Sequence, residues 1–224
     1  MPLKDWNIQI FRGVLTGLND AFIIDWALKD ELIKKAPKSD EIIRPILRGR
    51  NISPYVADYD NLWLINAHNG IKEKGIPPVN VEKDYPIVYE HLLKYKQKLI
   101  KRQDQGDHWT NLRNCAYIEE FLKPKIIYPN MTKYLPFVYD KGSFFTNQKC
   151  FIITGNHLGY LTAFLNSCLF KYCYRDNFPE LLGGTRELRK IFFDYIPVKK
   201  VDEGLNKIFK KLIEEIFKRK NKNQ

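Results

Sequence analysis

Four short segments of the sequence each mix cationic side chains with amide or hydroxyl side chains and a glycine. They contain Arg12, Thr16 and Asn19; Arg48, Arg50 and Asn51; Lys101, Arg102, His108, Trp109, Asn111 and Arg113; and Gly183, Gly184, Thr185, Arg186, Arg189 and Lys190. Arginine can form two parallel hydrogen bonds with a phosphate or with guanine, and asparagine can do so with adenine. One such segment alone is more typical of a solvated loop or a local cap. The joint occurrence of four favours contact with nucleic acid.

Trp109 adds an aromatic ring to the third segment. An exposed tryptophan can stack on a base or wedge into a duplex. A tryptophan that anchors a loop to its own core is the commoner arrangement. The residue types alone leave both interpretations open.

The motifs of the common catalytic centres are absent from the sequence. An adenine methyltransferase needs a glycine-bearing loop and an Asn/Asp-Pro-Pro-Tyr/Phe stretch, and neither occurs. The acidic residues are dispersed among lysines rather than clustered as in a nuclease. His68, His91, His108 and His157 lack zinc-binding spacing, and no GxxxxGK or GxGxxG phosphate loop is present. We therefore expect no catalytic residue, no metal site and no cofactor in this chain.

The composition is that of a folded protein with a basic bias. The 224 residues include 37 Lys and Arg against 26 Asp and Glu, so the formal net charge is +11. With 44% hydrophobic residues, the chain lacks the signature of disorder and is long enough for one large core or two small ones. An excess of positive charge is common in proteins that bind nucleic acid, although many basic proteins carry it for solubility.

Cysteine usage and hydropathy indicate a cytoplasmic protein. Cys115, Cys150, Cys168 and Cys173 show no CxxC spacing and lie among apolar or aromatic neighbours, so we expect buried, reduced thiols. Charged and polar residues interrupt the N-terminal segment, and the most apolar stretch, 158–174, contains a lysine. These patterns argue against a signal peptide and against a membrane span.

Apolar periodicity and turn residues predict the elements that position the four segments. A short strand is expected at the start of the stretch 8–25, followed by a loop and a second strand over 21–24. Further strands are expected over 62–67, 125–128, 137–139, 143–145 and 150–154, with a hairpin turn at Asp140, Lys141 and Gly142. Helices are expected over 26–35, 40–47 with Ser39 as N-cap, 84–101, 157–172, and shortly after Thr185. This order without strict βαβ alternation predicts an α+β fold with a mixed, largely antiparallel sheet and several packed helices.

The sequence predicts one domain over residues 1–198, followed by a basic tail helix over 199–224. The tail carries five of the net positive charges. Its apolar residues recur at helical spacing: Leu205, Ile208, Phe209, Leu212, Ile213, Ile216 and Phe217. Such an amphipathic helix can pack on its own domain or dock a neighbouring domain or subunit.

A longer succession of strings resembles a known family. These strings are RGVLTGLNDAFIID (12–25), ILRGRNISPY (46–55), LWLINAHNG (62–70), YPIVYEHLLKYKQKL (85–99), HWTNLRNCAYIEEFLKPKIIYP (108–129), FFTNQKCFIITG (144–155), YLTAFLNSCLFKY (160–172) and TRELRKIFFDYIPV (185–198). In this order they resemble the TaqI-like C-terminal specificity domain. That domain is the target-recognition part of type IIG restriction-modification enzymes and related adenine-N6 DNA methyltransferases.

The resemblance implies a module that binds the major-groove side of a DNA duplex. A separate domain or subunit would supply S-adenosylmethionine-dependent methylation, with or without an Mg²⁺-dependent endonuclease. The residues that match the family motifs are Arg12, Gly13, Thr16, Gly17 and Asn19; Arg48, Gly49 and Arg50; and Trp109, Asn111, Leu112 and Arg113. Thr110 stands where the family usually has an aromatic residue. Because Met1 directly precedes the specificity region, the chain resembles an excised domain, a truncated product or a free-standing specificity subunit.

The leading hypothesis is a sequence-specific, double-stranded DNA recognition domain of a type II, IIG-like restriction-modification adenine methyltransferase, without catalysis of its own. The predicted DNA-binding residues are Arg12, Thr16, Asn19, Arg48, Arg50, Asn51, Lys101, Arg102, Trp109, Asn111, Arg113, Thr185 and Arg186. The alternative is a subunit-interaction module that binds DNA only together with a separate methyltransferase or nuclease subunit. An independent nuclease and an RNA-binding role are further rivals.

Overall fold

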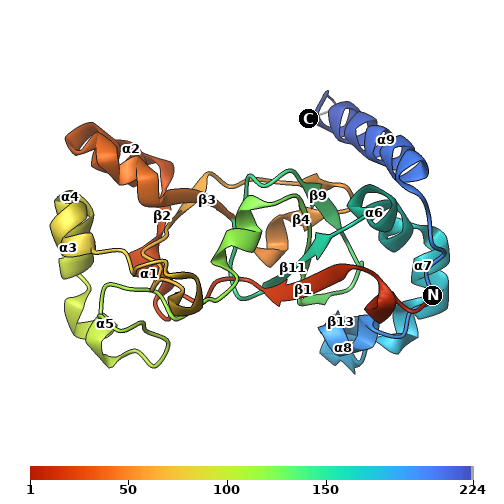
Figure 1. The fold of residues 1–224 in the computed structure, drawn as a ribbon, viewed down its shortest axis with the longest axis horizontal. Helices are drawn as coiled ribbons and strands as arrows, with labels where there is room; N and C mark the ends of the chain where they lie inside the picture. Colours follow the sequence, from red (N-terminus) through yellow and green to blue (C-terminus); the bar gives the residue numbers. More distant parts are fainter. Residues whose placement is uncertain (223–224) are drawn as a thin grey trace. The chain divides into compact units, whose positions relative to one another are not determined.

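The computed structural model describes residues 1–222 and divides into two compact units (Figure 1). The first unit contains Met1–Gly13, Arg48–Asp58 and Glu120–Gln224, and the second contains Val14–Leu47 and Tyr59–Glu119. The chain passes between the units four times, so neither unit is a continuous piece of sequence. The predicted tail helix lies within the first unit.

The first unit is built on an antiparallel sheet with the strand order β1-β11-β7-β9. These strands are β1 (Ile8–Arg12), β11 (Cys150–Gly155), β7 (Lys125–Pro129) and β9 (Val138–Asp140). A second antiparallel sheet has the order β12-β13-β8 and joins Glu180–Leu181, Thr185–Glu187 and Met131–Thr132. The short strands β4 (Ile52–Ser53) and β5 (Val56–Ala57) pair with each other, and β10 spans Phe145–Thr146.

The core of the first unit is rich in aromatic side chains. Helices α6 (Leu158–Asn166), α7 (Cys168–Tyr174) and α8 (Lys190–Phe193) contribute to it, and α6 contacts β7 and β9. The rings of Tyr128, Phe137, Phe170, Phe178 and Phe193 are fully buried in one cluster. This burial of apolar surface is the main stabilising contribution to the unit.

Helix α9 (Glu203–Lys222) packs along α6, which confirms the predicted amphipathic helix as far as the described residues reach. The Asn206 side chain accepts a hydrogen bond from the Tyr160 backbone N–H at 3.1 Å, and the Phe209 ring contacts the Tyr160 ring. Of its apolar stripe, Ile213 is buried. Four further stripe residues stay exposed: Leu205, Ile208, Leu212 and Phe217.

The second unit combines a small antiparallel sheet with five α-helices. The strands β3 (Ile43–Leu47), β6 (Leu62–Ile65) and β2 (Ile23–Asp25) pair in that order. The helices are α1 (Asn19–Phe22), α2 (Trp26–Lys35), α3 (Val81–Asp84), α4 (Pro86–Leu93) and α5 (Lys96–Lys101). The structure thus confirms an α+β fold with antiparallel sheets, a helix over 26–35 and strands near 62–67, 125–128 and 150–154.

The predicted helix over 40–47 is wrong. Residues Pro37–Ile42 form a 3-10 helix, and Ile43–Leu47 is strand β3. Proline removes a backbone donor and disfavours helical geometry at the residue before it. Pro45 therefore holds Arg44 in the extended conformation, and both residues pair with β6.

Two predicted long helices are each divided. The helix expected over 84–101 becomes α3, α4 and α5, because Tyr85 precedes Pro86 and adopts a non-helical conformation, and because the chain turns at Lys94 and Tyr95. The helix expected over 157–172 divides at Ser167, whose hydroxyl accepts a hydrogen bond from the Phe170 N–H and caps α7.

Smaller predictions also need correction. The strand expected over 21–24 begins only at Ile23, after the single turn of α1, and the one expected over 143–145 begins at Phe145. The turn after Asp140 is present, but β9 pairs with β7 rather than with the strand that follows the turn. Cys168 and Cys173 are exposed rather than buried, because α7 directs Phe170 to the core instead.

None of the helices in residues 1–222 combines the length and the apolar composition that a membrane span requires.

Candidate nucleic-acid interface

Two glycine-containing segments hold the turn at residues 146–149 between them in the first unit. The Gly13 N–H donates to the Cys150 carbonyl at 2.9 Å, and a Cβ at Gly13 would lie 2.0 Å from the Asn147 carbonyl oxygen. On the other side, a Cβ at Gly49 would lie 3.3 Å from the Lys149 carbonyl oxygen. Only glycine allows this approach of main chain to main chain at position 13.

The packing of this turn brings predicted cations together. The exposed Arg12 side chain donates through Nε to the Gln148 carbonyl at 3.2 Å. Arg50, which is also exposed, follows Gly49 directly. Lys149 is exposed on the turn itself. Segments that are far apart in the sequence thus present positive charge around one turn.

Substituting Gly13 tests this packing. Gly13→Ala is expected to destabilise the chain by about 1–3 kcal/mol, because the new methyl group would collide with the Asn147 carbonyl. The matched control is Gly204→Ala in the first turn of α9, where the nearest atom is 3.3 Å away and alanine favours the helix. Denaturant unfolding of both variants checks this. Equal stability of the two variants would contradict the close packing at Gly13.

Arg50 also lines a groove of about 880 Å³ in the first unit. We call it the basic groove. Its lining residues are Gly49, Arg50, Ile52, Ser53, Pro54, Pro129, Met131, Thr132, Lys133, Tyr134, Leu135, Pro136, Lys171 and Arg175. The lining includes four cations and no carboxylate, so the groove carries a positive potential that favours an anion.

Three of these cations have no carboxylate partner in the part of the chain that the structure describes: Lys133, Lys171 and Arg175. The acidic side chains of Asp176 and Glu180 are instead held by Arg186, whose Nη2 lies 3.0 Å and 2.8 Å from them. An uncompensated cluster of cations is costly to keep together unless it meets negative charge. Phosphate groups would supply that charge.

The groove wall is the connection between two core strands. Residues 130–137 link β7 to β9, and within them β8 pairs with β13. Leu135 and Pro136 are buried, whereas Lys133 and Tyr134 are exposed. Gly183 and Gly184 of the fourth predicted segment take positive φ angles in the β12–β13 connection, and Gly183 lies near the Lys133 ammonium. This segment is therefore connected to the groove wall through the pairing of β13 with β8.

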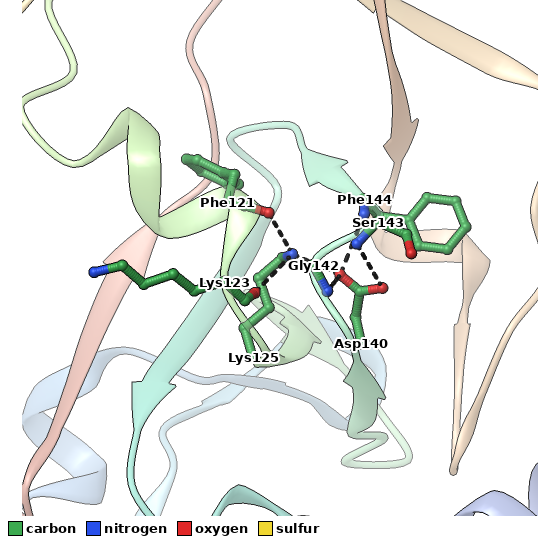
Figure 2. Close-up of polar contacts among 7 residues, drawn as sticks. All are labelled: Phe121, Lys123, Lys125, Asp140, Gly142, Ser143 and Phe144. Atoms are coloured by element: carbon green, nitrogen blue, oxygen red, sulfur yellow. Dashed lines mark hydrogen bonds and ion pairs between the residues drawn. The ribbon is translucent and has the colours of Figure 1, made fainter.

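A buried ion pair closes the other end of the β7–β9 pair (Figure 2). Lys125 Nζ lies 2.5 Å from Asp140 Oδ2 and donates to the Phe121 carbonyl at 2.6 Å. The Asp140 carboxylate also accepts the backbone N–H groups of Gly142, Ser143 and Phe144. Burial lowers the pKa of Lys125, and the charge of Asp140 opposes that shift. The pair fixes the strand register from which the groove wall projects.

In the second unit, Arg102 is a structural clamp rather than a surface cation. Only 8% of the residue is exposed. Its guanidinium donates to the carbonyls of Thr16, Trp109 and Asn111 and lies over the Phe22 ring. Burial lowers its pKa to about 10, against the opposing effect of Asp104. The clamp joins the first predicted segment to the third.

Replacing this clamp should cost stability. Arg102→Lys is expected to destabilise the chain by about 2–4 kcal/mol, because an ammonium cannot span three carbonyls that the guanidinium fork reaches. Arg113→Lys is the control, since Arg113 is exposed and pairs with Asp104 at the surface; it should change stability little. Thermal unfolding measures both. A larger loss for Arg113→Lys would contradict the assignment of the clamp.

Several predicted DNA contacts are likewise used inside the fold. The Asn111 amide donates to the His68 and Val79 carbonyls, and the buried Asn51 amide donates to the Asp58 carbonyl. Thr16 is buried and donates to the exposed Asn19. Trp109 is half-buried against the Tyr89 ring, which favours the loop-anchoring interpretation. The remaining predicted residues divide by exposure: Lys101 is exposed, Arg48 and Thr185 are half-buried, and Arg186 is buried.

The profile of the TaqI-like C-terminal specificity domain family matches residues 44–198. The chain belongs to this family. Two solved structures share the fold of this chain. The chain is similar to the type IIL restriction-modification enzyme MmeI, solved in complex with DNA, at a TM-score of 0.66 and 12% identity over 99% of this chain. It is also similar to the type IIG restriction endonuclease BpuSI, at a TM-score of 0.59 and 17% identity over 96% of this chain.

This chain spans 28% of the length of MmeI and 26% of the length of BpuSI. No curated protein matches it. Family membership makes it a DNA-recognition domain of the kind found in type II restriction-modification enzymes. The basic groove lies entirely inside the matched region, whereas Arg12, Thr16 and Asn19 lie before it.

Sequence reasoning missed most of the groove of the specificity domain. Of the predicted residues, only Arg50 lines it, and Lys133, Tyr134, Lys171 and Arg175 were not among them. The proline after Leu135 is a turn signal next to a lysine and a tyrosine, and it could have indicated an exposed segment. Lys171 gives no such signal, because it lies in an apolar stretch that predicts a buried helix.

Proposed function

We propose that the specificity domain binds double-stranded DNA with the phosphate backbone in the basic groove. The observation that carries this proposal is the set of four lining cations without a lining carboxylate. Arg12 and Lys149, exposed beside the Gly49–Arg50 segment, extend the positive surface beyond the groove. Backbone contacts of this kind fix the register of a protein on a duplex, and neighbouring side chains then read the bases.

In this proposal the domain selects the target but does not catalyse. No cluster of three or more His, Cys, Asp or Glu side chains is placed to hold a metal ion in residues 1–222. The partner would be an adenine-N6 methyltransferase domain or subunit that binds S-adenosylmethionine, with Mg²⁺ where the assembly also cleaves DNA. The DNA-complexed MmeI, in which a domain of this fold is about a quarter of the chain, supports such a larger enzyme. The cytoplasm is the compartment where this enzyme would meet DNA.

Selection from a randomised pool of duplex DNA tests the proposal. The purified chain is incubated with the pool at low and at higher salt, and the bound fraction is sequenced. We expect one short motif to be enriched and to survive the higher salt. Binding that is blind to sequence and disappears with salt would favour the alternative, a module that reads DNA only together with its catalytic subunit. Absence of binding at both salts would refute the proposal.

A further inference from the structure

We propose that the Tyr134 ring stacks against bases at an opened step of the duplex, rather than contacting a phosphate. This inference rests on the proposed function, because it requires DNA in the basic groove. It begins from the exposure of the ring: 74% of Tyr134 is accessible, and the residue lines the groove beside Lys133. An aromatic side chain in a lining of cations has no charge with which to attract a phosphate, but its ring can stack on any base.

The main chain around Tyr134 holds the side chain outward. The Tyr134 N–H donates to Thr132 Oγ1 at 3.1 Å, which closes a tight turn at the end of β8. Leu135 then takes a φ of +48° although its side chain is 1% exposed. A branched side chain at positive φ is a rare, strained conformation, and the following Pro136 restricts the same residue further. Such strain persists only where the surrounding fold enforces it.

The anchoring of Leu135 in the core decides the direction of its neighbours. Leu135 belongs to the same buried cluster as Phe137 and Leu188. With Leu135 pointing inward, the turn leaves Lys133 and Tyr134 on the groove side. β8 pairs with β13, and Arg186 of β13 is tied to the Phe178 carbonyl and to acidic side chains. The ring is therefore presented on a stiff support, which reduces the entropy lost on stacking.

In this proposal two neighbouring residues of the groove make different kinds of contact with the DNA. Lys133 supplies a point charge for a phosphate, so its contribution should fall with salt. Tyr134 supplies a flat surface for a base, so its contribution should be nearly independent of salt. A ring that inserts between stacked bases binds best at a base-pair step whose stacking is already weak. Less free energy of base stacking must be given up there.

The experiment compares two probes: a mixed-sequence DNA duplex and the same duplex with one central mismatch. Binding of the wild-type chain, Tyr134→Phe, Tyr134→Ala and Lys133→Ala is measured over a series of salt concentrations, with thermal unfolding to confirm that each variant folds. The wild type should prefer the mismatched duplex. Tyr134→Phe should retain affinity and preference. Tyr134→Ala should bind about 5- to 100-fold more weakly, lose the preference and keep the salt slope, whereas Lys133→Ala should reduce the slope by about 1.

Three outcomes overturn the inference. Equal losses in Tyr134→Phe and Tyr134→Ala would assign the role to the hydroxyl group and a phosphate. An unchanged Tyr134→Ala variant, or a wild type without preference for the mismatch, would exclude stacking. In each of these cases salt-dependent binding by the wild type would leave the proposed function standing. A wild type that binds neither duplex would instead refute the proposed function itself.

Discussion

Reversing the charges of the basic groove is expected to reduce the affinity of the chain for duplex DNA by about 100- to 1,000-fold at moderate salt. The change is a triple variant, Lys133→Glu, Lys171→Glu and Arg175→Glu. None of these three side chains has a carboxylate partner within the described residues, so the fold loses no ion pair. Each cation that meets a phosphate releases about one counterion, so the slope of log affinity against log salt should decrease by about 3.

The control for this variant has to carry the same change in net charge. Lys199→Glu, Lys200→Glu and Lys207→Glu provide it, because these exposed lysines do not line the groove. Fluorescence anisotropy with a labelled duplex at several salt concentrations measures both triple variants. If the control loses as much affinity as the groove variant, the effect is that of total charge, and the groove is not the binding site.

Removing the acidic member of the buried pair is expected to destabilise the first unit by about 3–5 kcal/mol. Asp140→Ala leaves the Lys125 ammonium without its counter-charge at a site with no solvent exposure, and it also leaves three backbone N–H groups without their acceptor. Denaturant unfolding of the full chain measures the loss. The double variant Lys125→Met, Asp140→Ala should recover part of it, because no buried charge remains.

The surface pair of Lys141 with Glu214 is the matched control for the buried pair. Lys141 directly follows Asp140, but its side chain is 66% exposed. Lys141→Met should therefore leave the unfolding midpoint nearly unchanged. A deficit of equal size in this control would show that the loss in Asp140→Ala does not come from an uncompensated buried charge.

The pH dependence of the Asp140 variant follows from the depressed pKa of Lys125. Burial lowers that pKa and Asp140 opposes the shift, so the pKa should decrease further once Asp140 is removed. Between the depressed folded pKa and the ordinary lysine pKa, the unfolded chain binds more protons than the folded chain, so stability rises with pH. The deficit of Asp140→Ala relative to the wild type should therefore shrink toward alkaline pH. A constant deficit would contradict a charged Lys125 as its cause.

The elements that the sequence predicts well are those with a strong local signal. Helix α2 begins at an aspartate cap and ends in two lysines, and α9 repeats its apolar residues at helical spacing from Leu205 to Phe217. The failures have local causes as well: Pro45 converts an expected helix to a strand, and Ser167 divides another. In these cases a single residue outweighs the periodicity around it.

The candidate site is harder to predict because the same residue types serve two purposes. Arg102 and Asn111 have the pattern of a DNA-reading loop, yet both satisfy main-chain carbonyls inside their own unit. A loop that must close on itself needs the same donors as a loop that reads a base edge. The basic groove, by contrast, takes its cations from segments near residues 50, 133 and 171–175, so no window of sequence contains it.

The chain passes between its two units four times, and this limits how such a domain can evolve by recombination. A single recombination crossover between two relatives, placed anywhere from Val14 to Glu119, joins parts of different parents within at least one unit. A hybrid of this kind must repack a core from sequences that were never selected together. Exchange of the second unit as a whole therefore needs paired crossovers around both Val14–Leu47 and Tyr59–Glu119, so relatives can exchange this unit intact only through several simultaneous crossovers.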